Sequence, residues 1–183
     1  MGGGGGSRPA PAPAPAPAPV YRPPVLAAIS PNDSPATIAQ KYTDFQNAGG
    51  QLNGTQQSYL SNYNQNKANI DAGNLQINSS GSVSMAPVTA GMSGEKKGQI
   101  YAAGAAIGTQ LTPAQNLFLS NYNTYSGAVN SGAASIDPDT GMAVPKAAPQ
   151  GETAAQKTAR MNAYTKATGL VLNAQGVPTQ ATN

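Results

Sequence analysis

Apolar residues recur at helical spacing in several stretches of the chain, and glycine follows most of these stretches. In residues 37–48, Ile38, Tyr42 and Phe45 recur at spacings of four and three, which places them on one face of a helix. The glycine pair that follows is a typical helix end. The same pattern predicts helices over residues 54–72, 95–107 and 152–168, and from Pro113 onward.

Two of the predicted helices begin with capping signals. Thr112, Pro113 and Gln115 place a capping threonine, a proline at the first helical position and a reciprocal glutamine in the required order. Asn53 and Gln56 form a variant of the same capping box. These signals predict where the longer helices start.

Short apolar segments flank turn-forming residues after the predicted helices, which is the pattern of β-hairpins. One hairpin is expected between Leu75 and Met85, and a second between Ile136 and Met142. A third is expected over residues 170–177, where apolar residues precede an Asn-Ala-Gln-Gly turn and Val177 follows it. The pattern therefore predicts a mainly α fold with short β-hairpins.

One pentapeptide, Leu-Ser-Asn-Tyr-Asn, occurs at residues 60–64 and again at residues 119–123, an offset of 59 residues. Further pairs match at this offset: Leu52 with Leu111, Gln56 with Gln115, Tyr59 with Phe118, Ile70 with Val129, Gly73 with Gly132, and Ile77 with Ile136. The sequence thus predicts tandem helix-turn-helix-hairpin repeats. Such units stack because one unit alone does not cover its apolar face.

Residues 1–24 are of low complexity, with a glycine run followed by proline that alternates with alanine over residues 9–19. Proline fixes φ and lacks an N–H donor, so an extended arm of polyproline II type is expected here. Its role is open between a spacer or disordered tail and a strap along a neighbouring subunit. Val25, Leu26 and Ile29 then form a short apolar plug that folds back on the core or docks on a partner.

These features divide the chain into four parts. Residues 1–36 form the glycine run, the proline arm and the apolar plug. Residues 37–90 form a first repeat unit and residues 91–149 a second. Residues 150–183 form a partial third unit with one helix fewer.

The composition indicates a chain that gains stability from a partner surface or from self-association. Charged residues are 9% of the chain, against about 25% in an ordinary soluble domain. There are 2 Phe and no Trp, so large apolar anchors are scarce. The net charge of +3 is spread thinly, with Lys96 and Lys97 as the one adjacent basic pair, so specific nucleic-acid binding is not expected.

The sequence predicts no catalytic, cofactor or metal site. It has no Cys and no His, which removes thiol and histidine chemistry, and no phosphate-binding loop motif is present. Its seven acidic residues stand mostly at predicted helix ends and turns. Asp137, Asp139 and Gly141 resemble the start of a calcium loop, but the twelfth position is Ala148, so a plain turn is expected. No apolar run is long enough to span a membrane and no signal peptide is visible.

Several large residues lie on helix faces where they serve either a core or an interface between helices. We expect these faces and the apolar plug to dock on neighbouring subunits. The interface candidates are Val25, Leu26, Ile29, Tyr59, Leu60, Tyr63, Phe118, Leu119, Tyr122 and Tyr125.

The glycine start, the proline arm, the charge-poor Asn/Gln/Ala-rich helices and the short repeated units together resemble minor virion structural proteins of tailed bacteriophages. The resemblance implies a multi-copy structural component of the virion whose partners are other virion proteins. It assigns no functional residues.

The leading hypothesis is therefore a non-enzymatic structural component of a phage particle: a minor capsid, portal- or tail-associated, or adaptor protein. One alternative is an internal ejection protein that is released into the host envelope, and this alternative alone predicts membrane association. Another is a bacterial surface or envelope adaptor with a Pro-Ala spacer, which requires a secretion signal.

Overall fold

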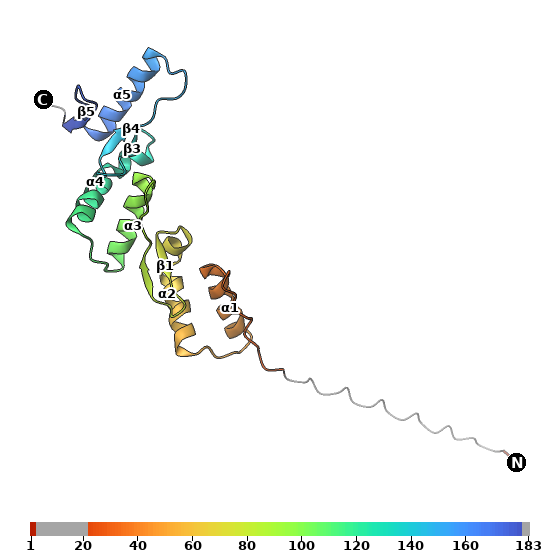
Figure 1. Cartoon of the computed structure of the whole chain (residues 1–183). Helices are drawn as coiled ribbons and strands as arrows, with labels where there is room; N and C mark the ends of the chain where they lie inside the picture. Colours follow the sequence, from red (N-terminus) through yellow and green to blue (C-terminus); the bar gives the residue numbers. More distant parts are fainter. Residues whose placement is uncertain (3–21, 181–183) are drawn as a thin grey trace.

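The computed structural model describes residues 1–2 and 22–180, and Figure 1 shows the whole chain. The described part contains five α-helices and three antiparallel two-stranded sheets. The prediction of a mainly α fold with short hairpins is confirmed. The polyproline arm predicted over residues 9–19 lies outside the described residues.

The order helix, helix, strand, strand occurs twice and is followed by helix, strand, strand. The first group contains α1 (Pro35–Asn47), α2 (Gly54–Asp71), β1 (Leu75–Ile77) and β2 (Val83–Met85). The second group contains α3 (Gly94–Ala106), α4 (Pro113–Asn130), β3 (Ala134–Ile136) and β4 (Ala143–Pro145). The third group contains α5 (Ala154–Thr168), β5 (Leu170–Leu172) and β6 (Pro178–Gln180).

Side-chain caps explain where the helices begin. The predicted capping boxes at Asn53 and Thr112 are present, each with its glutamine bonded back to the backbone of the capping residue. Two predicted starts need correction by two residues. α1 begins earlier, at Pro35, because Ser34 caps it and proline suits the first turn. α5 begins later, at Ala154, because Thr153 is its cap.

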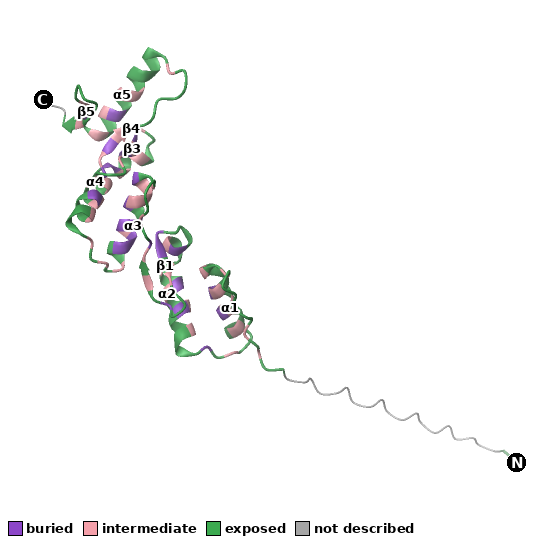
Figure 2. Cartoon of the chain, viewed as in Figure 1, coloured by how far each residue is buried: buried purple, intermediate pink, exposed green. Residues whose placement is uncertain are grey.

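Each of the first two groups is held by an edge-on aromatic pair between its two helices. The rings of Tyr42 and Tyr59 join α1 to α2, with centroids 5.6 Å apart and planes at 84°. The rings of Tyr101 and Phe118 join α3 to α4, with centroids 5.5 Å apart and planes at 81°. The two pairs belong to two separate hydrophobic clusters, and each cluster also includes residues from across the junction, such as Ala103 in the first and Met85 in the second. Figure 2 shows these buried patches as short bands along the chain.

The first helix of each later group packs on the hairpin that precedes it. α3 approaches β2 so closely that a Cβ on Gly104 would lie 2.6 Å from the sulfur of Met85. The Nζ of Lys96 in α3 also donates to the carbonyl oxygen of Ala72, at 2.6 Å. α5 packs on the second hairpin, where the Tyr164 hydroxyl donates to the carbonyl oxygen of Ala143 at 2.8 Å. The groups therefore follow one another in an elongated stack (Figure 1).

The tip of each of the first two hairpins rests on the second helix of its own group. The Nδ2 of Asn62 donates to the carbonyl oxygen of Gly81 at 2.8 Å. The Nδ2 of Asn121 donates to the carbonyl oxygen of Thr140, also at 2.8 Å. Gly81 is buried, and a Cβ there would lie 2.7 Å from the Cα of Tyr59. The asparagine at the centre of the repeated pentapeptide thus anchors the hairpin to the helix.

We predict that Gly81→Ala destabilises the chain more than Gly49→Ala. Both glycines have positive φ, +85° and +88°, so alanine is strained at either place by about 1–2 kcal/mol. Only at Gly81 does the added methyl group meet the backbone of α2, because nothing lies within 4 Å of a Cβ on Gly49. Overpacking adds about 1–3 kcal/mol. Urea unfolding followed by circular dichroism measures both losses of stability, and equal losses would contradict the seating of the tip on α2.

Candidate functional site

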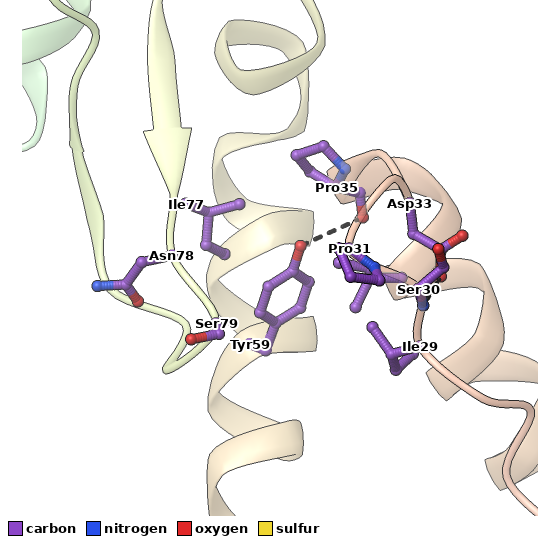
Figure 3. A pocket seen from close by; sticks show the side chains of 10 residues that line it. Ile29, Ser30, Pro31, Asp33, Pro35, Tyr59, Ile77, Asn78 and Ser79 are labelled. Carbon is purple, nitrogen blue, oxygen red and sulfur yellow. Dashed lines mark hydrogen bonds between the residues drawn. The ribbon is translucent and has the colours of Figure 1, made fainter.

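A hollow of about 410 Å³ lies between the start of α1, the side of α2 and the turn of the β1–β2 hairpin (Figure 3). It is lined by Ile29, Ser30, Pro31, Asp33, Pro35, Ile38, Tyr59, Ile77, Asn78 and Ser79. Its walls combine isoleucine, proline and tyrosine carbons with a few hydroxyl, amide and carboxylate groups. We call it the α1 pocket.

The segment that enters α1 forms one wall of the α1 pocket and is fixed by charge. The Nζ of Lys41 lies 2.6 Å from Asp33 Oδ2 and also donates to the carbonyl oxygen of Ala28 at 2.6 Å. The backbone amide of Ser30 donates to the same carboxylate at 2.8 Å. The hydrogen bond from Lys41, followed by that from Ser30, lowers the pKa of Asp33 below its usual value. The carboxylate therefore stays ionised at neutral pH and holds this wall in place.

Tyr59 forms the floor of the pocket from α2. The residue is only 2% exposed, and its hydroxyl donates to the carbonyl oxygen of Pro35 over 3.5 Å (Figure 3). Burial raises the pKa of Tyr59 to about 12, and the neighbouring hydroxyls of Tyr42 and Tyr63 act in the same direction. A phenol with this pKa is neutral at physiological pH, so it serves as a hydrogen-bond donor at the floor.

In the second group, the corresponding place between α3 and β3 holds a smaller hollow of about 150 Å³, lined in part by Lys97, Phe118 and Pro138. Three contacts tie the helix to the hairpin there. A Cβ on Gly94 would lie 2.3 Å from the carbonyl oxygen of Ile136, so glycine permits the helix to touch the strand. The amide of Ile136 donates to Glu95 Oε1 at 2.9 Å. The Nζ of Lys97 donates to the carbonyl oxygen of Pro138 at 2.7 Å.

In the first group, none of the three contacts has a chemical equivalent. At the offset of 59 residues, Pro35 stands in place of Gly94, an alanine in place of the glutamate, and Ile38 in place of Lys97. Proline carries a Cβ, so it does not allow the close approach that Gly94 makes. The two apolar side chains have no group that can hydrogen-bond the hairpin. These three differences account for the open α1 pocket.

The structure brings part of the predicted apolar plug to this pocket. Ile29 lines it and is 40% exposed, while Val25 is 87% exposed on the segment that leads to it. Leu26 is half-buried and packs against the hydrophobic cluster of the first group. The plug therefore folds back through Leu26 and leaves two apolar side chains accessible.

The other interface candidates face the interior of the chain, which corrects the expectation that they form free docking faces. Tyr59, Tyr63, Phe118 and Tyr125 are between 2% and 8% exposed. Leu60, Leu119 and Tyr122 are half-buried against the two hydrophobic clusters. The physical reason is that each long helix needs its apolar stripe to hold the paired helix and the hairpin. The helical spacing of the aromatic residues therefore indicates core positions of this chain.

The sequence patterns did not indicate the residues that complete the pocket, notably Ile38, Ile77 and Asp33. A residue-by-residue comparison of the first and second groups, at the offset of 59 residues, would have indicated them. At equal offset, Ile38 takes the place of Lys97 and Pro35 takes the place of Gly94. These two differences show where the first group cannot close its helix onto its hairpin.

The Asp-Pro-Asp-Thr-Gly segment forms a turn, as the sequence predicts. Asp137 Oδ1 accepts from the backbone amides of Asp139 and Thr140 and from the Thr140 hydroxyl. Burial alone would raise the pKa of Asp137, but the hydrogen bonds from Thr140 and the backbone amide of Asp139 outweigh it, and the pKa is lowered. Residues 1–2 and 22–180 contain no cluster of three or more His, Cys, Asp or Glu side chains arranged to hold a metal ion.

None of the helices in the described part of the chain combines the length and the apolar character that crossing a bilayer requires. In comparisons with known proteins, no family profile, no curated sequence and no solved structure matches this chain. The α1 pocket and its exposed rim are therefore the features on which a functional proposal rests.

We predict that Tyr59 ionises about two pH units above an ordinary tyrosine. Its pKa of about 12 exceeds the free value of 10.0, so the folded state favours the neutral phenol. This contribution to stability is complete below pH 10 and is lost as the pH rises from about 10 to about 12. The tyrosinate absorbance of wild type minus that of Tyr59→Phe should show a midpoint near pH 12. A midpoint near pH 10 would show that the phenol is not buried at the pocket floor.

Proposed function

We propose that this protein is a non-enzymatic structural component of a phage particle that docks on neighbouring protein subunits. In this proposal the chain consists of tandem helix-turn-helix-hairpin repeats preceded by an extended Pro/Ala-rich arm. The docking surface is the α1 pocket together with the exposed side chains of Val25 and Ile29. Its partners are other virion proteins, and its place is the virion.

The observation that carries the proposal is that apolar side chains are exposed at and near the open α1 pocket. Ile29 remains accessible in a lining that also includes Ile38 and Ile77, and Val25 is exposed four residues before it. Full burial of one such side chain stabilises a complex by about 1.5–3 kcal/mol. A partner that covers the rim and fills the pocket gains this energy with little ordering of the site, because Asp33 and Lys41 already fix the wall.

The repeated architecture supports a structural role. The edge-on aromatic pair and the asparagine bond to the hairpin tip recur with nearly equal geometry in the first two groups. Stacked units of this kind present long surfaces and two different ends to partners. The resemblance to virion proteins in composition and in the proline arm gives the particle as the setting.

The state of the described carboxylates fits a role without proton transfer. Asp71 and Glu152 are each paired with a basic side chain, Lys67 and Arg160 respectively. The hydrogen bond from Lys67 lowers the pKa of Asp71, and the hydrogen bond from Arg160 lowers the pKa of Glu152. Both acids therefore stay ionised near neutral pH, whereas a general acid needs a raised pKa.

We predict that Val25→Asp combined with Ile29→Asp lowers incorporation into particles at least tenfold. A charge at the rim must be desolvated when a partner covers it, which opposes docking. Leu117→Asp is the matched control, because Leu117 is 64% exposed on α4 and lies away from the pocket. Quantitative mass spectrometry of purified particles gives the copy number, and equal incorporation of both variants would contradict the docking surface.

Removal of residues 1–24 is predicted to abolish incorporation while the helical circular dichroism signal is retained. The reason is that alternating proline restricts the backbone, so the segment is expected to lose little entropy when it docks along a neighbouring subunit. Particles purified from cells that express the truncated chain provide the measurement. Normal incorporation would contradict a role of the arm in docking.

A further inference from the structure

The third hairpin has the same tip as the first but lacks the helix on which that tip rests. Asn173 Oδ1 accepts from the amides of Gln175 and Val177, at 3.0 and 2.9 Å. In the first hairpin, Asn78 Oδ1 accepts from two amides at the corresponding places, both at 3.0 Å. A glycine of positive φ follows in each, with +77° at Gly176. The turns of the first and third hairpins therefore share the same hydrogen-bond pattern.

The surroundings of the tips differ. Gly81 and Gly141 are buried against the backbones of α2 and α4. Gly176 is exposed, with nothing within 4 Å of a Cβ built on it. Val177 beside it is 52% exposed. In the third group α5 leads directly into β5 through one glycine, Gly169, so no second helix stands under the tip.

A hollow of about 310 Å³ adjoins this bare tip, between the second and third hairpins. Its apolar walls are formed by Met142, Val144, Val177 and Pro178, and its polar edge includes Asp137. An apolar side chain from a helix that lay across the tip would enter this hollow. The bare tip thus has both an apolar seat and a free backbone turn.

We propose that the β5–β6 hairpin is a docking site for an amphipathic helix of a partner protein. The helix carries an asparagine whose side-chain amide donates to a carbonyl at the tip, at Gln175 or Gly176, as Asn62 and Asn121 do within this chain. Its apolar face covers Val177. The inference rests on the third hairpin alone and is separate from the docking surface at the α1 pocket.

The model for the occupant is the type of helix that seats the first two hairpins, and in the described part of the chain both helices of this type are already in use. α2 and α4, the two helices that carry the pentapeptide, are each committed to their own hairpins through Asn62 and Asn121. Each has 18 residues, which gives the length of helix that the site accepts.

The sequence of α4 provides a probe whose docking mode is known. Residues 112–131 are appended to the full chain after Asn183 through a flexible glycine-serine linker, which makes binding intramolecular. Hydrogen–deuterium exchange is then measured for residues 173–180. We expect exchange at the amides of this hairpin to slow at least tenfold relative to the chain without the added helix.

Two matched variants distinguish specific docking of the appended helix from non-specific association. In one, the counterpart of Asn121 in the appended helix becomes Ala. In the other, Val177→Lys places a charge on the hairpin while the appended helix is unchanged. Loss of protection in both supports the proposal, whereas unchanged exchange in the original fusion, or protection that persists in either variant, overturns it. Because residues 1–24 and the α1 pocket play no part in this test, its outcome is independent of the docking surface proposed above.

Discussion

The structure depends on one contact, the seating of a hairpin tip on the helix before it. In both complete groups, an asparagine amide reaches a tip carbonyl over 2.8 Å, and a glycine without Cβ lets the turn touch the helix backbone. The contact fixes the hairpin along its own helix and turns its other face outward. That face receives the first helix of the next group, where Gly104 meets Met85. The chain has few charges and few large apolar residues, and its groups stack because glycines let hairpins and helices pack closely.

The two ends of the stack follow from the same contact. Within residues 22–34, the described segment that leads into α1, the chain is bonded to Lys41, which stands where α3 has the buried Ile100. The start of α1 has Pro35 where α3 has Gly94, so the α1 pocket stays open. At the other end a hairpin is present without its helix, and its Gly176 is bare.

Helical and hairpin periodicity predicted most of the fold because local signals determine it. The capping boxes at Asn53 and Thr112, the glycine stops and the turn residues act within a few positions of each other. The direction of the aromatic stripes was not predictable in the same way, since spacing shows that Tyr59 and Phe118 share a face with other apolar residues but not which element covers it. The α1 pocket was missed because it arises from residues far apart in sequence, such as Ile29 and Ile77.

Native-state hydrogen exchange of Asn62→Ala, compared with Asn64→Ala, tests most directly whether tip seating couples the groups. Asn62 bonds the tip, whereas Asn64 is an exposed neighbour in the same pentapeptide. A hydrogen bond of this kind contributes about 1 kcal/mol, or roughly a fivefold change in opening. The account predicts faster exchange in Asn62→Ala at residues 75–85 and also in α3, with neither change in Asn64→Ala. Faster exchange confined to the hairpin, with α3 unaffected, would contradict it.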